Sequence, residues 1–277
     1  MARLDGIQGA VAGIHSAGFL RRGVRSQDQA KVEWTEYGTG FAVLVSAPAA
    51  IPTWYWEPFI RTVGEHFRTV LVHPRGLGHG ELPNDLRAVT VADHARDLLR
   101  VIEELRLEDY AIVGHCIGAA PVFKCLSKLS RRPRLVMVTS ARLEAGTAAQ
   151  NLEKVIERVR ADLHFRRQYA QVAAGYAPEA FRRELELRLQ SSDELEAHLW
   201  AVQSVRLYSY SDPWPVDVAA VFVTSTGDLE SIKASTVAYA SGLGATSRRH
   251  FQLEGGHFAI LENPDLGLWL IRKALNS

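Results

Sequence analysis

The stretch that decides the fold is YAIVGHCIGAAPVFKCL at residues 110–126. It opens with the apolar run YAIV, which is typical of a short buried strand, and Gly114 ends that run. From residue 119 an apolar stretch follows without a linker and predicts a helix packed on the same core. The residues between them, GHCIG, must therefore make a sharp turn from strand to helix.

The turn Gly114-His115-Cys116-Ile117-Gly118 has the form of a strained nucleophile position. Glycines two residues before and two residues after Cys116 relieve clashes that Cβ atoms would cause. The sulfur would lie at the N-terminus of the following helix, where the helix dipole and free backbone N–H groups favour a thiolate. Because a free thiol titrates near about pH 8.5, a modest lowering of its pKa gives substantial thiolate at neutral pH. We predict Cys116 as the nucleophile.

Strands and helices alternate upstream of this turn in the way that builds a mainly parallel sheet. Residues 91–107 place apolar side chains at helical spacing and charges on the other face, which predicts an amphipathic crossover helix. The remaining upstream predictions are strands at 31–37, 41–47 and 69–74 and a helix at 56–66.

Downstream, a long helical stretch interrupts the alternation. The strand RLVMVTS at 134–140 is followed by residues 148–207, which are rich in Arg, Glu, Leu and Ala and carry no strand signal. We interpret this stretch as an insertion. The alternation then resumes with a strand ending near residue 225, a helix at 229–241, a strand and turn at 248–257 and a terminal helix at 264–275.

A thiol nucleophile needs a base and a group that orients the base. His257 follows a glycine pair after the last strand, so its imidazole can point back across the edge of the sheet. Asp228 directly follows the preceding strand and is the predicted carboxylate. Glu230 competes, although it falls one turn into the next helix. The strand ending at Ser140 offers no carboxylate at its tip.

The order Cys116, Asp228, His257 is similar to the nucleophile-acid-histidine order of the α/β-hydrolase superfamily. From about residue 30 onward the chain resembles that superfamily, as a variant with cysteine where members usually carry serine. Residues 91–120 and 253–264 carry the resemblance most specifically. It implies an α/β-hydrolase fold, in which helices flank a mainly parallel central sheet and the active site lies under the insertion. The expected core is 1–147 with 208–277, residues 1–30 being an N-terminal extension, and the expected helical cap or lid is 148–207.

The sequence departs from the family in the loop Ser46-Ala47-Pro48-Ala49-Ala50. Similar proteins place His-Gly and a backbone N–H of the oxyanion hole there. Pro48 has no N–H, so the first donor is expected from Ala49 or, with a shifted register, from Ala47. The other donor is expected from Ile117. Losing one such donor costs about 10² to 10³ in rate.

Further side chains are expected near the pocket or in the core. We interpret three residues at the end of the strand at 69–74 and in the turn after it as structural, namely His73, Arg75 and His79. Four residues are candidates for lining the pocket: His115, Trp54, Tyr55 and Trp56. For the three aromatic residues at 54–56, a position on the surface or in the core fits the sequence equally well. Cys125, in the interior of the helix after the turn, is expected to pack in the core.

Composition excludes several classes of protein. The 277 residues are 47% hydrophobic and 23% charged with a net charge of +1, so no strong field attracts nucleic acid or an acidic membrane. Two cysteines are too few for a disulfide scaffold and are expected as free thiols in a reducing compartment. The N-terminus lacks the pattern of a secretory signal, and no apolar run reaches about 18 residues. The expected location is the cytoplasm.

In the predicted reaction His257 takes the thiol proton and Cys116 attacks an ester or thioester carbonyl. The resulting acyl-cysteine is a thioester close in energy to thioesters of coenzyme A or phosphopantetheine, so an amine, alcohol or thiol can compete with water. Two enzyme classes stay open: a cysteine-dependent hydrolase, meaning an esterase or thioesterase, and an acyltransferase or offloading enzyme. A third reading, a binding protein without catalysis, would predict a damaged triad position, and all three positions look competent.

The expected partner is a small-molecule ester or thioester, free or attached to coenzyme A or an acyl carrier protein. Residues 151–190 carry eight Lys or Arg against six Asp or Glu. This excess is typical of a solvated helical face, with contact to an acidic carrier protein or a phosphate-bearing substrate as the alternative. No cofactor, metal ion, nucleic acid or membrane is expected, and the sequence predicts no oligomeric state.

Overall fold

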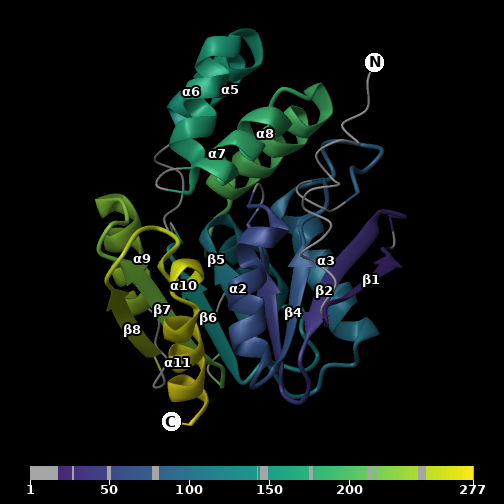
Figure 1. Ribbon diagram of the computed structural model, residues 1–277, viewed down its shortest axis with the longest axis vertical. Helices are drawn as coiled ribbons and strands as arrows, with labels where there is room; N and C mark the ends of the chain where they lie inside the picture. The colour runs from purple at the N-terminus through teal and green to yellow at the C-terminus, as the bar shows by residue number, and fades with distance from the viewer. Residues whose placement is uncertain are drawn as a thin grey trace.

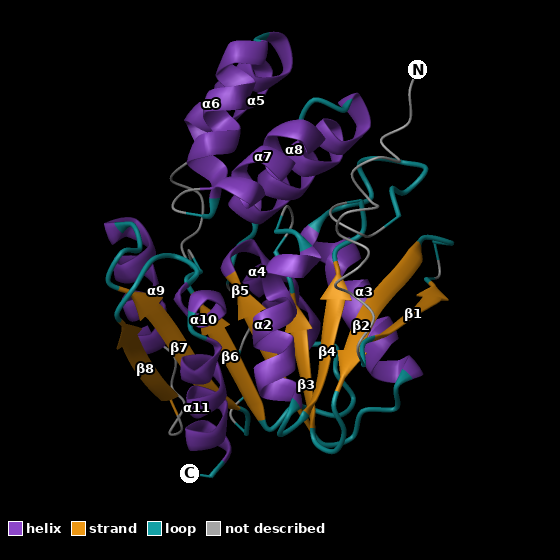
Figure 2. Cartoon of the chain, viewed as in Figure 1, coloured by secondary structure: helices purple, strands orange, loops and turns teal. Residues whose placement is uncertain are grey.

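The structure of the protein, a computed structural model, describes residues 18–26, 28–48, 51–76, 81–141, 143, 149–174, 177–210, 214–215, 217–242 and 248–276. Within these ranges the centre is an eight-stranded sheet with the order β1-β2-β4-β3-β5-β6-β7-β8 (Figure 2). The strands are β1 (Leu20–Arg25), β2 (Lys31–Tyr37), β3 (Ala42–Ser46), β4 (Arg68–His73), β5 (Tyr110–His115), β6 (Leu135–Thr139), β7 (Ala219–Ser225) and β8 (Arg248–Leu253).

Strands β3 to β8 run parallel, while β2 is antiparallel to both β1 and β4. The predicted mainly parallel sheet is therefore confirmed. Strand β1 lies inside residues 1–30, the stretch that the sequence assigned to an N-terminal extension, and it pairs with β2 along its whole length. Its sequence LRRGVR has no apolar alternation, and most of its residues are exposed. Main-chain pairing therefore defines this edge strand.

Two layers of helices cover the two faces of the sheet, and alternate strand residues point into different cores. Val43 and Val45 belong to one apolar cluster, whereas Ala42 and Leu44 belong to the other. The first cluster contains side chains of α2 (Thr53–Gly64), α10 (Ala259–Glu262) and α11 (Pro264–Leu275), and the second contains side chains of α3 (Val91–Glu104), α4 (Ala119–Leu126) and α9 (Glu230–Gly242). Helix α11 begins at Pro264, as predicted, because proline fits the first turn of a helix.

In the described part of the chain between β6 and β7, four helices lie beyond the edge at which the parallel strands end (Figure 1). They are α5 (Ala149–Ala161), α6 (Leu163–Ala174), α7 (Glu179–Arg188) and α8 (Ser192–Leu207). Helix α7 contacts the start of α2, where the rings of Phe181 and Tyr55 stack with centroids 5.6 Å apart. Helix α8 contacts the start of α3, where the Ser204 hydroxyl accepts a hydrogen bond of 2.8 Å from the backbone N–H of Val91. Among the described helices, none is both long and apolar enough to cross a bilayer.

Candidate active site

The strand-turn-helix around Cys116 holds its backbone in the left-handed region, with φ of +51°. A non-glycine residue in that region is strained, and such positions concentrate at functional sites. Close packing on both sides requires the flanking glycines. A Cβ atom on Gly114 would lie 2.9 Å from Cα of Ala119, and one on Gly118 would lie 2.4 Å from the carbonyl oxygen of Ser46. The turn therefore packs Gly118 against the end of β3 and leads directly into α4.

The structure brings Cys116, His257 and Asp228 into one hydrogen-bonded chain. His257 Nδ1 lies 2.7 Å from Asp228 Oδ1, and the other side of the imidazole hydrogen-bonds the Cys116 thiol. Two donors fix the remaining carboxylate oxygen, Oδ2. They are the backbone N–H of Ser225 at 2.7 Å and the hydroxyl of Ser140 at 2.9 Å. The carboxylate is thus held from behind and orients the imidazole toward the sulfur.

Glu230, the competing carboxylate, lies outside this chain. It is exposed at the first residue of α9 and pairs with Lys233 at 2.6 Å. Asp228 instead is buried, because the turn after β7 meets the turn after β8. The backbone N–H of Gly227 donates to the carbonyl of Gly255 at 2.8 Å, and Gly255 has a φ of +125° that favours glycine. These glycines bring the acid and the histidine together.

Electrostatic interactions within this hydrogen-bonded series favour a thiolate at Cys116 and an imidazolium at His257. Burial alone would raise the pKa of the Cys116 thiol, but the charge of His257 and hydrogen bonds from His257 and from the N–H of Ile117 outweigh it and hold that pKa below its ordinary value. Burial would lower the pKa of His257, but the thiolate of Cys116 and the hydrogen bond to Asp228 raise it to about 10. Both shifts favour a thiolate-imidazolium pair over a neutral thiol and imidazole.

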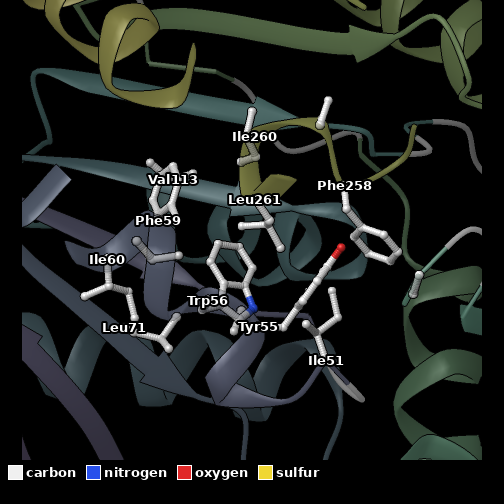
Figure 3. Packing of buried hydrophobic residues seen from close by; sticks show 14 of the residues in the cluster. Ile51, Tyr55, Trp56, Phe59, Ile60, Leu71, Val113, Phe258, Ile260 and Leu261 are labelled. Atoms are coloured by element: carbon white, nitrogen blue, oxygen red, sulfur yellow. The ribbon is translucent and has the colours of Figure 1, made fainter. Parts of the chain in front are cut away.

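A cluster of rings lies beside His257, which contacts two of its members, His115 and Phe258. The cluster includes three of the four candidates for lining the pocket. His115 and Trp56 are completely buried, with ring centroids 5.9 Å apart. Tyr55 is buried and packs edge-on against Phe258, as Figure 3 shows together with Trp56 in the same cluster. Trp54 is half-buried and donates from Nε1 to Glu184 on α7 at 2.7 Å. These aromatic residues support the site and the docking of α7.

The described residues include two of the three expected oxyanion-hole positions. The N–H of Ile117 already hydrogen-bonds the sulfur of Cys116, so it points at the reacting atom. Ala47 is buried against Gly118, since a Cβ on that glycine would lie 3.0 Å from the carbonyl carbon of Ala47. Ala49, the preferred first donor in the sequence interpretation, lies outside the described residues.

The residues interpreted as structural have partners away from the sulfur. Arg75 is buried and its guanidinium pairs with Asp97 and Asp28, including a bond of 2.7 Å from Nε to Asp97 Oδ2. His73 Nε2 lies 2.8 Å from the Thr35 hydroxyl, and His79 lies outside the described residues. The core position predicted for Cys125 is confirmed: it is completely buried, and burial raises the pKa of its thiol to about 12.

The sequence assigned no role in the site to two residues where β6 ends, Thr139 and Ser140. Thr139 hydrogen-bonds His115 across the strands, with 2.8 Å between Oγ1 and Nδ1. Ser140, with a φ of +48°, supplies one of the two hydrogen bonds to Asp228 Oδ2. Their position at a parallel strand end is the available signal, because the ends of parallel strands meet at one edge of the sheet.

Comparisons with known proteins identify the fold family. The alpha/beta hydrolase fold family matches residues 49–264. Two curated relatives carry the name "Putative carbamate hydrolase RutD". The one from Agrobacterium fabrum is 32% identical over 96 residues, 34% of each chain, and the one from Azorhizobium caulinodans is 28% identical over 82 residues, 30% of each chain. The chain thus spans about a third of the length of the curated relatives it matches.

Solved structures match almost the whole chain. A thermophilic esterase from Thermogutta terrifontis has a TM-score of 0.72 at 18% identity, and the match covers 93% of this chain and 98% of the esterase. The enol-lactonase from Burkholderia xenovorans has a TM-score of 0.75 at 16% identity, with 92% of this chain and 100% of the lactonase covered. At these identities the likeness establishes the shared fold.

Proposed function

The chain belongs to the α/β-hydrolase fold family, and from that premise we propose that it is a cysteine-dependent hydrolase that works through an acyl-Cys116 thioester. The observation that carries the proposal is the hydrogen-bonded chain from Cys116 through His257 to Asp228. A nucleophile, a base and an orienting carboxylate in contact are the arrangement that nucleophilic acyl chemistry needs.

In the acylation step, the Cys116 thiolate attacks the carbonyl carbon of an ester or thioester and a tetrahedral oxyanion forms. The N–H of Ile117 stabilises that oxyanion, with a second donor from Ala49 or Ala47. The C–O or C–S bond to the leaving group breaks, and His257 gives its Nε2 proton to the leaving oxygen or sulfur. Asp228 holds the imidazolium in place during this transfer. The product is a thioester between the acyl group and Cys116.

In deacylation, His257 takes a proton from a water molecule as the water oxygen attacks the thioester carbonyl. The C–S bond breaks, the acid leaves and the thiolate is restored. The names of the relatives support hydrolysis of a small carbonyl compound, because the RutD proteins carry the name of carbamate hydrolases and similar structures include esterases. Helices α5 to α8 lie beyond the strand ends that carry the triad, and we assign residues 148–207 the role of a cap over the site.

Acyl transfer is a second candidate, and one observation favours it. The nucleophile is a thiolate with a lowered pKa, so the acyl-enzyme stays an activated thioester that an amine, alcohol or thiol can attack in place of water. A donor on coenzyme A or a carrier protein would then be nearly balanced in energy with the acyl-enzyme. A reducing compartment such as the cytoplasm keeps both thiols free, and we place the enzyme there.

One assay separates the two candidates. Thioester donors are offered with and without amine, alcohol and thiol acceptors, and the acid and the transfer products are quantified. A hydrolase yields acid at the same rate with every acceptor, whereas a transferase yields acceptor-dependent product. Cys116→Ala abolishes both reactions, and Cys125→Ala is the matched control that retains them. Full activity in Cys116→Ala would overturn the mechanism.

A further inference from the structure

His115 is a buried, ionisable side chain that takes no part in the proposed acylation and deacylation steps. Its side chain is 0% exposed, and it lies next to Cys116 at the end of β5. The β5–β6 register puts His115 directly opposite Thr139, and Nδ1 of the imidazole lies 2.8 Å from the threonine Oγ1. The ring is therefore fixed from the sheet side by one cross-strand hydrogen bond.

The other side of the His115 ring faces the catalytic histidine. The centroids of His115 and His257 are 5.2 Å apart with an interplanar angle of 51°. Two further rings complete the surroundings, Phe258 at 5.7 Å and Trp56 at 5.9 Å. The rings of His115 and Phe258 thus both pack against the ring of His257.

Burial and the neighbouring charge keep His115 neutral. Burial lowers the pKa of His115 well below its ordinary value, and the positive charge of His257 lowers it further. Among the residues that the structure describes, the titratable groups that interact with His257 are Cys116, Asp228 and His115. Trp56 on α2 and Phe258 before α10 bring no charge. The imidazolium thus has one neutral polar ring behind it and two anionic partners at its edges.

The second nitrogen of His115 has no hydrogen-bond partner among the described residues. If Nε2 carried the proton, its partly positive N–H would have no acceptor and would lie close to the positively charged ring of His257. The favoured tautomer therefore has the proton on Nδ1, which donates to Thr139 Oγ1, and a lone pair on Nε2. His115 is buried among rings, so little water screens its interactions. The lone pair on its Nε2 therefore stabilises the positive charge of the nearby His257 ring.

We propose that His115 is a positioning residue whose neutral imidazole, pinned to Thr139, holds the His257 ring from behind and favours its charged form. The inference rests on the proposed role of His257 as the base for Cys116. It adds to that role a reason for histidine at position 115: an apolar side chain would fill the space without supplying a lone pair.

The pH dependence of Cys116 alkylation by iodoacetamide tests this proposal, because the alkylation rate reports the fraction of thiolate without any substrate. The midpoint of this pH profile is the pKa of the Cys116 thiol. The side chain of His115→Gln reaches as far as Nε2, whereas that of His115→Asn reaches only to Nδ1. The Gln variant is expected to keep the wild-type midpoint. The Asn variant is expected to raise it by about one unit, which slows alkylation about tenfold below the midpoint. Equal midpoints in wild type and both variants would overturn the proposal.

Thr139 provides a second test that leaves the His115 ring in place. Thr139→Val removes the hydrogen bond to Nδ1 and is expected to raise the midpoint, while Thr139→Ser restores it. A merely structural role would lower the melting temperature of the Val variant without moving the midpoint, and that result contradicts the proposal. A wild-type midpoint already at the value of a free thiol would instead overturn the thiolate mechanism itself, so the two failures are distinguishable.

Discussion

Replacing Asp228 with asparagine should uncouple His257 from Cys116. From the described residues the carboxylate accepts three hydrogen bonds, one on Oδ1 from His257 and two on Oδ2 from Ser225 and Ser140. The backbone N–H of Ser225 cannot turn away, so the single carbonyl oxygen of Asp228→Asn must face it. The amide NH₂ then faces His257 Nδ1, forces that nitrogen to accept, and leaves the imidazole proton on the side of the sulfur.

The size of the effect on the pKa of His257 follows from the loss of its hydrogen bond to the Asp228 carboxylate. A hydrogen bond to a charged group is worth about 1.5–3 kcal/mol, and each 1.4 kcal/mol is about tenfold, so the imidazolium loses stability by about one to two pKa units. Loss of the base costs on the order of 10² to 10⁴ in kcat/KM. Because the imidazolium holds the thiol pKa down, the alkylation midpoint of Cys116 should rise toward about 8.5.

The assay pairs steady-state ester hydrolysis with the pH profile of iodoacetamide alkylation. Glu230→Gln is the matched control, since it neutralises the exposed carboxylate two residues away and should leave both measurements at wild-type values. An Asp228→Asn variant with wild-type midpoint and wild-type kcat/KM would refute the reasoning.

Further predictions concern the surroundings of the triad. Ser140→Ala removes one of the two hydrogen bonds to Asp228 Oδ2 and should lower kcat/KM about tenfold; an unchanged value would show that the backbone bond from Ser225 suffices. Gly118→Ala puts a Cβ against the Ser46 carbonyl and should slow acylation about tenfold or more by shifting the oxyanion loop, measured by stopped flow; wild-type acylation contradicts this. Phe181→Ala removes the ring stacked on Tyr55 and should lower the free energy of unfolding by about 3 kcal/mol in urea titration, whereas an unchanged value would mean that α7 docks without this ring. Activity should rise as pH passes the lowered pKa of Cys116 and fall as His257 loses its proton near pH 10, so a pH-rate profile with no decline toward pH 10 counts against the imidazolium as the proton donor.

The parts of the candidate site that depend on local patterns could be proposed from the sequence. The strand-turn-helix around Cys116 could be predicted because apolar runs and paired glycines constrain the backbone within a few residues. Asp228 and His257 could be predicted because each follows a strand, and parallel strands end at one edge. The start of helix α11 could be predicted because proline, here Pro264, is favoured in the first turn of a helix.

Other parts depend on contacts between distant residues, which a single sequence does not reveal. Ser140 reaches Asp228 across 88 positions, and a hydroxyl at a strand end is a common feature. Strand β1 forms through main-chain pairing and has no apolar pattern, and α10 spans only four residues. An aromatic residue in a helix shows no preference for pocket or core. Trp56 therefore could be placed only by the structure, which buries it completely, and the packing of the His115 ring against His257 is likewise seen only in the structure.

Intact mass of the enzyme after rapid mixing with an excess of an activated acyl donor tests the central claim most directly. The expected result is a single acyl addition that peptide mapping places on Cys116, that is present in Cys125→Ala and that is absent in Cys116→Ala. The addition should disappear on the timescale of product formation. Turnover without any acyl addition, or an addition that persists in Cys116→Ala, would contradict a thioester intermediate on Cys116.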